Sequence, residues 1–235
     1  MQRPLLQLAL DTFDLPSALA PMQRARQYVD VVEAGTILCL AEGMRAVRAL
    51  RVLYPDKLLL ADVRIAEAGS IIAKLAFDAG ADIVSVVSGA TPDTLEVVLR
   101  EARSRNGQVQ LELIDGWSWD QLEGWRALGI EQVITHRSRD GEALGSLSWR
   151  PEDFDQMRAL ADAGFKVIVA GGVELGDLPS FAGVPIHIFT VGRAIRGAAD
   201  PAAAARAFQE GIDEVYGGAA ATPETAPQAT VERSA

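Results

Sequence analysis

Carboxylates follow three of the short apolar runs in this sequence, each at the point where a strand would end. They are Asp11, Glu33 and Asp62. If these runs are neighbouring parallel strands, the carboxylates converge on one mouth, where their repulsion is costly unless a cation lies between them. Glu33 and Asp62 are therefore candidate Mg²⁺ ligands, because Mg²⁺ takes one or two carboxylates and fills its shell with water and substrate oxygens. The same spacing also suits a structural network in which the carboxylates pair with Arg64.

Glycine turns follow the last two apolar runs and read Gly171-Gly172 and Gly192-Arg193. In a barrel of alternating strands and helices, backbone N–H groups and a helix N-terminus at this place commonly hold a phosphate. A single Gly-Gly pair is usually only a turn. Two turns on adjacent strands, the second with an arginine that can make a charged contact, favour a phosphate site.

A histidine, His136, ends the sixth run and is followed by Arg137 and Arg139. The neighbouring guanidinium groups favour the neutral imidazole, which suits proton transfer near pH 7. A histidine at a strand end is also commonly a hydrogen-bonded structural group. Glu112, within the fifth run, adds a further carboxylate to the same end of the sheet.

Short apolar runs rich in β-branched residues alternate with longer segments of helical period along the chain. The runs that predict strands are 5–10, 29–33, 58–61, 83–87, 109–113, 132–135, 166–170 and 186–190. The segments that predict helices or helical turns are 17–28, 43–53, 68–79, 94–103, 118–128, 151–163, 175–181 and 201–216. Strands that alternate with helices imply a parallel sheet, and eight such units close into a single (β/α)8 TIM barrel, predicted here over residues 1–216.

An open doubly wound sheet is the other fold that this alternation allows. That fold would need a glycine-rich phosphate loop after the first strand, and residues 11–14 contain no glycine. Gly80, Gly129 and Gly164 each precede a new strand, as expected where a helix returns to the sheet in a repeated unit. Residues 217–235 are rich in Ala, Pro and Thr and are predicted to form a disordered tail.

The 235 residues carry a net charge of −10, which argues against nucleic acid as a partner because duplex binding needs a basic surface. No apolar stretch reaches the roughly 20 residues that cross a bilayer, and the first residues lack the pattern of a secretory signal. One cysteine, Cys39, can form no internal disulfide and is predicted to be a core residue. These features predict a cytoplasmic protein without a membrane partner.

The sequence resembles the 3-keto-L-gulonate-6-phosphate decarboxylase family, within the orotidine-monophosphate-decarboxylase suprafamily that also holds hexulose-phosphate synthase. The likeness runs from Leu5 to about Tyr216. The motifs that carry it are LALD at 8–11, EAGTILC at 33–39, LAD at 60–62, QLEL at 110–113, HRSRD at 136–140, GG at 171–172 and VGRAIR at 191–196. The HRSRD motif is the most discriminating, because the synthase branch differs there.

The resemblance implies a Mg²⁺-dependent decarboxylase that converts 3-keto-L-gulonate 6-phosphate to L-xylulose 5-phosphate and CO₂ through an enediolate. It also implies a homodimer with the active site at the interface. The resemblance also implies roles for single residues. Glu33 and Asp62 would bind Mg²⁺, Arg64 would stabilise the enediolate, and His136 and Arg139 would place the protonating water. Glu112 would position a substrate hydroxyl or a water, and Glu67 would contact the neighbouring protomer's site. The residues implied to bind the substrate and its phosphate are Asp11, Thr36, Gly171, Gly172, Gly192 and Arg193.

The sequence departs from the family at one motif. The family pattern Asp-x-Lys-x-x-Asp reads DVRIAE at 62–67, so Arg64 replaces the lysine and Glu67 the second aspartate. The opposed charges persist, and a pair formed by these two side chains across the dimer would explain why both are enlarged. Arginine stabilises an anion but does not deliver a proton. Two alternatives therefore stay open: another enediolate reaction on a sugar phosphate, such as a synthase-like aldol reaction or an epimerisation, and a catalytically silent sugar-phosphate-binding protein.

Overall fold

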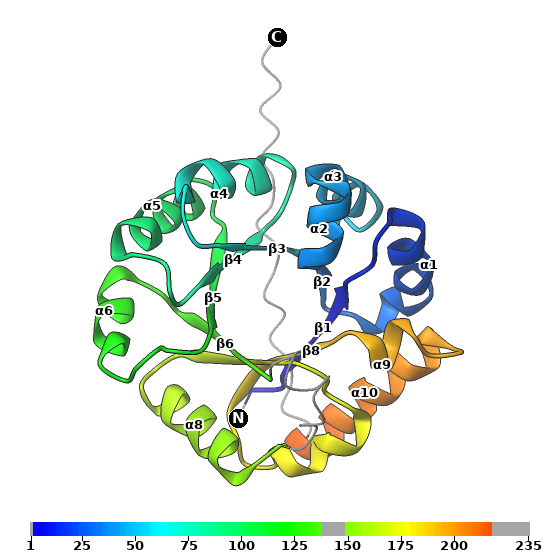
Figure 1. The fold of residues 1–235 in the computed structure, drawn as a ribbon. Coiled ribbons are helices and arrows are strands. Elements are labelled where there is room, and N and C mark those ends of the chain that lie inside the picture. The colour runs from blue at the N-terminus through cyan, green and yellow to red at the C-terminus, as the bar shows by residue number, and fades with distance from the viewer. Residues whose placement is uncertain (1, 138–148, 218–235) are drawn as a thin grey trace.

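A closed barrel of parallel strands forms the centre of the molecule (Figure 1), as the alternating pattern predicts. The computed structural model describes residues 2–137 and 149–217. The strands pair in sequence order, and the last pairs with the first. They are β1 Leu5–Leu10, β2 Val31–Ala34, β3 Leu58–Ile65, β4 Ile83–Val87, β5 Gln108–Leu113, β6 Gln132–His136, β7 Lys166–Ala170 and β8 Ile186–Val191.

Helices surround the barrel as an outer ring (Figure 1). They are α1 Leu15–Ala25, η1 Arg26–Tyr28, α2 Thr36–Glu42, α3 Met44–Leu53, α4 Gly69–Asp78, α5 Pro92–Arg103, α6 Gln121–Leu128, α8 Pro151–Asp162, η2 Leu175–Phe181, α9 Arg193–Arg196 and α10 Pro201–Tyr216. The short helices α2 and α9 were not predicted, and both begin directly at the mouth of the barrel. The end of α10 coincides with the predicted end of the barrel, while the predicted tail lies almost wholly outside the described residues.

Side-chain caps fix where several helices begin. Asp14 accepts a hydrogen bond from the Ser17 N–H at 2.8 Å, and Thr91 and Asp200 cap α5 and α10 in the same way. Each of these helices has a proline in its first turn, where the missing N–H costs no helical hydrogen bond. The Asp14 cap explains why α1 begins at Leu15, two residues earlier than its apolar period predicts.

The apolar core has two parts, one on each side of the sheet. The larger part lies between the strands and the helices. The smaller part fills the inside of the barrel and consists of Val31, Leu58, Leu60, Ile83, Ile134, Ile168, Ala170 and Ile188. Because both faces are covered, the strands are apolar almost throughout, as expected for a parallel sheet.

A row of glutamines interrupts this inner core on β5 and β6. The Gln110 Nε2 donates to the Gln132 Oε1 at 3.1 Å, and the Gln132 Nε2 donates to Gln108. Gln110 and Gln132 are buried and lie opposite each other in the ladder. The Gln110 Oε1 has no hydrogen-bond partner among the described residues. The row is therefore a buried polar layer whose hydrogen bonds are incomplete.

Strand β3 contains an irregularity that its sequence does not predict. Its register against β4 shifts between Ala61 and Ile65, and the strand runs four residues beyond its predicted end at Ala61. Arg64, inside this bulge, has a φ of 46°, in the left-handed region that residues with a side chain rarely adopt. None of the helices in the described ranges is long and apolar enough to cross a bilayer.

Candidate active site

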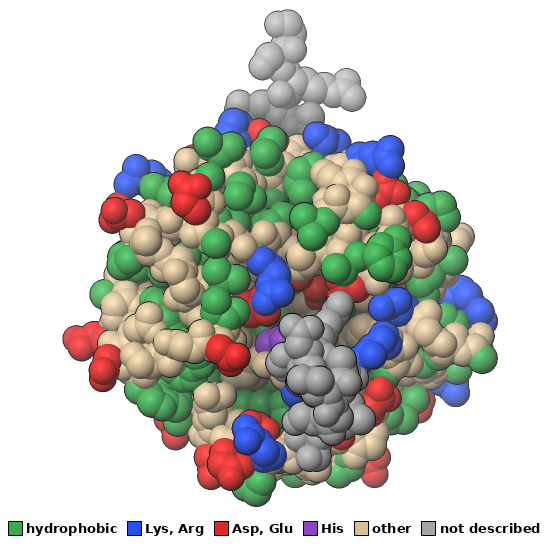
Figure 2. Space-filling view, viewed as in Figure 1, with side chains coloured by type: hydrophobic (Ala, Val, Ile, Leu, Met, Phe, Trp, Pro, Cys, Tyr) green, Lys and Arg blue, Asp and Glu red, His purple; other side chains and the backbone are tan. Residues whose placement is uncertain are grey.

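A cavity of about 410 Å³ opens at the carboxyl ends of the strands. Figure 2 shows acidic side chains and a histidine in the hollow at the centre of the barrel. Its lining includes these predicted site residues: Asp11, Glu33, Thr36, Asp62, Arg64, Glu112, His136, Gly171, Gly172, Gly192 and Arg193. Glu67 is exposed and is not part of this lining, and Arg139 lies outside the described residues. The barrel thus brings the residues predicted at the strand ends around one cavity, although they are up to 182 positions apart in the sequence, from Asp11 to Arg193.

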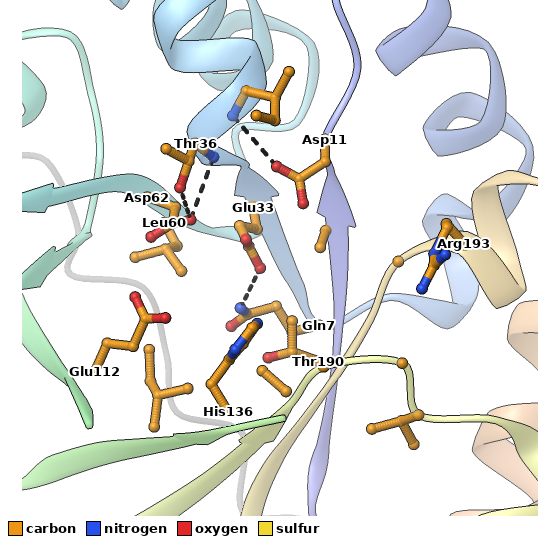
Figure 3. A pocket seen from close by; sticks show the side chains of 18 of the residues that line it. Gln7, Asp11, Glu33, Thr36, Leu60, Asp62, Glu112, His136, Thr190 and Arg193 are labelled. Carbon is orange, nitrogen blue, oxygen red and sulfur yellow. Dashed lines mark hydrogen bonds between the residues drawn. The ribbon is translucent and has the colours of Figure 1, made fainter. Parts of the chain in front are cut away.

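Asp62 is held by hydrogen bonds to both of its carboxylate oxygens. The Oδ2 accepts from the Thr36 backbone N–H at 3.2 Å and from the Thr36 hydroxyl (Figure 3). The Oδ1 accepts from the Ser85 hydroxyl at 2.6 Å. Ser85 is fully buried on β4. These contacts fix the orientation of the carboxylate from two neighbouring elements, α2 and β4.

Asp11 lies against the beginning of α2. Its Oδ1 accepts from the Ile37 N–H at 3.4 Å (Figure 3). The chain can approach this closely because residue 35 is glycine: a Cβ there would lie 2.3 Å from the Asp11 Oδ1. The first N–H groups of α2 thus hold two carboxylates, Asp11 and Asp62, and partial positive charge at a helix N-terminus favours such anions.

Glu33 is buried on β2 and accepts a hydrogen bond from the Gln7 Nε2 at 2.7 Å. Gln7 is also buried and lines the cavity, and its Oε1 has no hydrogen-bond partner among the described residues. Figure 3 shows the side chains of Asp11, Glu33 and Asp62 on one side of the cavity, with Glu112 and His136 across from them. Gln7 is a site residue that the sequence analysis missed.

Arg64 pairs with Glu112 across the mouth. Its Nη2 lies 2.6 Å from the Glu112 Oε1, and the Glu112 side chain is buried while that of Arg64 is 40% exposed. The Arg64 backbone N–H donates to the Ser85 hydroxyl at 2.8 Å, the same hydroxyl that donates to Asp62. Ser85 therefore fixes both the bulge that carries the cation and one of the carboxylates. The predicted pair of Arg64 with Glu67 would lie between two protomers, and a single chain does not test it.

Glu33 and Asp62 have the donor chemistry of a magnesium site, because both provide carboxylate oxygens. Outside residues 1, 138–148 and 218–235, no group of three or more His, Cys, Asp or Glu side chains is placed to hold a metal ion. Mg²⁺ needs only one or two carboxylates, and ligating carboxylates are normally oriented by further hydrogen bonds. Glu33 and Asp62 have such partners in Gln7, Thr36 and Ser85.

The pKa of the Cys39 thiol is affected by the carboxylates of the site. Burial, together with the charges of Asp62, Glu33 and Asp11, raises the pKa of the Cys39 thiol from 9.0 to about 12. The thiol is buried and donates to the Ala34 carbonyl, which confirms the predicted core position.

The raised pKa gives a prediction for alkaline stability. The unfolded chain ionises this thiol near pH 9, so its stabilising contribution is complete below that pH and is lost as the pH rises toward 12. Urea unfolding from pH 8 to 11 should show a free energy that falls more steeply in the parent than in Cys39→Ala, by up to about 1.4 kcal/mol per pH unit. Parallel curves for the two proteins would contradict the assignment.

Glycine turns and an arginine lie at the other side of the mouth. Gly171 and Gly172 have φ values of 90° and 66°, so a side chain at either position would be strained. Gly192 precedes α9, which begins at Arg193. In Figure 3, Arg193 lies to one side of β1, and Glu33 and Asp62 lie to the other. The cavity thus has an acidic end, with Glu33 on β2 and Asp62 on β3, and an end with glycine turns and a cation after β7 and β8. Strand β1, which precedes Asp11, lies between these two ends in the barrel.

Catalytic groups at the carboxyl ends of barrel strands define a TIM-barrel enzyme, and the two unlike ends of this cavity suit a small molecule with an anionic group. The profile of the Orotidine 5'-phosphate decarboxylase / HUMPS family matches residues 4–208, and the chain belongs to this family.

Within that family, similar relatives include 3-keto-L-gulonate-6-phosphate decarboxylases. The one named UlaD from Escherichia coli (strain UMN026) is 48% identical over 217 residues, which cover 92% of this chain and 100% of UlaD. A crystal structure of KGPDC from Streptococcus mutans, solved as a complex, superposes with a TM-score of 0.90 at 38% identity, covering 92% of this chain and 100% of that chain. The 3-hexulose-6-phosphate synthase of Salmonella typhimurium gives 0.82 at 30% identity, covering 89% and 99%.

These matches confirm the resemblance drawn from the motifs. They place the chain among the decarboxylases, so that it is a carbon–carbon lyase of the carboxy-lyase class.

Proposed function

We propose that this enzyme decarboxylates 3-keto-L-gulonate 6-phosphate to L-xylulose 5-phosphate and CO₂, in the cytoplasm, with Mg²⁺ and through an enediolate. The observation that carries the choice of substrate is the 48% identity to UlaD over all of UlaD's length. The geometry supports the chemistry, because the acidic end and the end with the glycine turns and Arg193 line the same small cavity.

Breaking the bond to the carboxylate leaves its electron pair on the substrate, where the adjacent keto group takes it up as an enediolate. Arg64 provides a fixed positive charge beside this developing anion, and its ion pair with Glu112 holds the guanidinium in place. Mg²⁺ bound by Glu33 and Asp62 would supply further charge stabilisation for the substrate oxygens. Asp11 and Thr36 line the same end and orient substrate hydroxyls.

A proton must then replace the lost CO₂ on the carbanion carbon. His136 ends β6 and lines the cavity, half-buried, across from the carboxylates (Figure 3). We assign it, with Arg139, the role of placing the water that gives this proton. Arg64 holds charge but does not take part in the transfer, because a guanidinium stays protonated.

The phosphate of the substrate occupies the end formed by Gly171, Gly172, Gly192 and Arg193. Backbone N–H groups at such turns, together with an arginine, are typical phosphate ligands. The binding energy of this remote group helps to hold the reacting end in register with Arg64 and the carboxylates.

A homodimer is part of the proposal. Large apolar side chains are exposed after β1, on α2 and on α4: Phe13, Leu40, Ile71 and Leu75 are between 53% and 83% exposed. Figure 2 shows apolar side chains gathered over α2, α3 and α4. Glu67, two residues before α4, is exposed, and we assign it the contact with a neighbouring protomer. Light scattering after size-exclusion chromatography should give the mass of two chains.

The proposal is tested by adding 3-keto-L-gulonate 6-phosphate to the enzyme in D₂O, with Mg²⁺ or with EDTA, and following the reaction by proton NMR. We expect one CO₂ for each L-xylulose 5-phosphate, with deuterium at the carbon that lost the carboxylate. Tight binding without turnover would identify a silent binding protein. Turnover of ketose phosphates without CO₂ release would identify an aldol or epimerase reaction instead.

Replacing Arg193 should mainly weaken substrate binding. Loss of a charged phosphate contact costs roughly 1.5–3 kcal/mol, so Arg193→Ala should raise KM about 10- to 150-fold with a smaller change in kcat. Arg206→Ala is the matched control, because Arg206 is an exposed arginine on α10 that pairs with Glu210. An unchanged KM for Arg193→Ala would place the phosphate elsewhere.

A further inference from the structure

Arg137 contacts the turn that follows the neighbouring strand. It comes directly after β6, and its guanidinium donates to two successive carbonyls beyond β7: Nε to the Gly171 oxygen at 3.0 Å and Nη2 to the Gly172 oxygen at 2.6 Å. Its backbone N–H donates to the Ala170 oxygen at 3.1 Å. One residue thus binds three consecutive carbonyls of the chain that forms the phosphate end of the cavity.

The direction of these bonds determines where the N–H groups of the turn point. In a planar trans peptide the C=O and the N–H point to opposite sides. The Gly171 and Gly172 carbonyls are turned toward Arg137, so the N–H groups of Gly172 and Val173 are turned away from it. Gly171, Gly172 and Val173 line the cavity, whereas Arg137 is not among its lining residues. Arg137 therefore lies behind the turn.

The turn and the arginine fit closely. A Cβ on Gly171 would come within 2.3 Å of the Arg137 backbone oxygen, so the two segments pack without room for a side chain between them. The guanidinium carbon lies 4.7 Å from the centre of the Trp149 ring, in cation–π contact. The Trp149 Nε1 donates to Asp177 at 3.2 Å, and its ring packs edge-on against Phe181. Arg137 is thereby fixed from both sides.

Other arginines make the same kind of contact at the opposite end of the barrel. Arg126 donates to the Ala163 oxygen at 2.6 Å, beside Gly164, and Arg103 donates to the Leu128 oxygen at 2.6 Å, beside Gly129. Those glycines also have positive φ. These turns lead from helices into strands, at the end of a TIM barrel that serves stability rather than catalysis. Arg137 likewise donates to the carbonyls of a glycine turn, but at the catalytic end of the barrel.

We propose that Arg137 is a positioning residue for the phosphate group. It holds the Gly171-Gly172 turn so that the N–H groups of Gly172 and Val173 face the cavity, and it does not itself touch the substrate. This inference rests on the proposed function, because it takes the phosphate to bind at this turn. It assigns to Arg137 a role separate from that of its neighbour His136.

The test compares Arg137→Met, Arg137→Lys and the matched control Arg126→Met. Inorganic phosphate, as a competitive inhibitor, probes the phosphate end directly. We expect Arg137→Met to raise KM and the phosphate inhibition constant by about 10- to 100-fold, the loss that is typical when a residue that orients a metal ligand is replaced, with kcat changed less than threefold. Arg137→Lys should restore part of the affinity. Arg126→Met should lower the unfolding temperature and leave both constants unchanged.

Each other outcome has a distinct meaning. Unchanged KM and phosphate inhibition in Arg137→Met, or a fall in kcat with KM intact, would overturn the positioning role. An equal rise of both constants in Arg126→Met would also overturn it, because general destabilisation would then explain the effect. If Arg193→Ala weakens phosphate binding and Arg137→Met does not, only this inference fails. If neither variant affects phosphate, the proposed phosphate end itself is wrong.

Discussion

Replacing Asp62 by Asn, or Glu33 by Gln, should lower kcat by roughly 10²- to 10⁴-fold, the largest loss that we expect from a single substitution. Each change removes a negative charge from the proposed Mg²⁺ site, and a bound cation typically contributes several kcal/mol of charge stabilisation. Isothermal calorimetry with Mg²⁺ alone should show weaker binding in both variants. EDTA should abolish turnover by the parent, and added Mg²⁺ should restore it.

A carboxylate at the far end of the barrel provides the control. Asp82 pairs with Arg51 and accepts from the Leu59 N–H at 2.8 Å, away from the cavity. Asp82→Asn should therefore reduce stability without changing Mg²⁺ affinity. Full turnover in excess EDTA, or unchanged Mg²⁺ binding by both Glu33→Gln and Asp62→Asn, would remove the metal role from these residues.

Arg64→Met should lower kcat/KM by about 10²- to 10³-fold, as expected when one group that stabilises an anionic transition state is lost. Glu112 holds the guanidinium at 2.6 Å, so Glu112→Gln should also be harmful. The double variant should be less impaired than the two single effects summed, because residues in contact show coupling of roughly 0.5–3 kcal/mol. Strictly additive effects on kcat/KM would contradict a functional pair.

The same cycle with Glu67→Asp and Arg64→Lys tests the pair predicted across the dimer. The effects of the two substitutions are compared at a concentration where the protein is dimeric. Non-additive effects would mean that Arg64 interacts with Glu112 of its own chain and with Glu67 of a second chain. If the Arg64→Lys, Glu67→Asp double variant is much faster than the parent on 3-keto-L-gulonate 6-phosphate, the parent has drifted from this substrate.

Most of the fold could be predicted because each strand is a distinct apolar run between helical segments. The predicted bounds of three strands, β1, β4 and β7, coincide with the structure. The helices α2 and α9 were missed because they have seven and four residues, too few to display a helical period. The extension of β3 was missed because it depends on a hydroxyl of β4, which no local pattern reveals.

The site residues, too, divide into those that a local sequence pattern reveals and those that depend on contacts with distant residues. Asp11, Glu33, Asp62 and His136 were found because a strand end is visible in the sequence. Gln7, Ser85 and Arg137 were not selected as site residues, because their importance lies in contacts with residues 26, 21 and 34 positions away. Residues that orient a functional group through hydrogen bonds carry no composition signal of their own. They become visible only when the neighbouring strand is known.

The glutamine row inside the barrel offers a way to make this enzyme more heat-tolerant without altering its chemistry. Gln110 and Gln132 bond to each other away from the cavity lining, so replacing one alone strands the amide of the other and costs stability. Replacing both by leucine removes the buried polar pair at nearly constant volume, and Gln108, which is half-buried, can turn toward water. The double replacement should therefore give an enzyme that stays folded at higher temperature. A screen of single substitutions would not find it, because each of the two single replacements is destabilising.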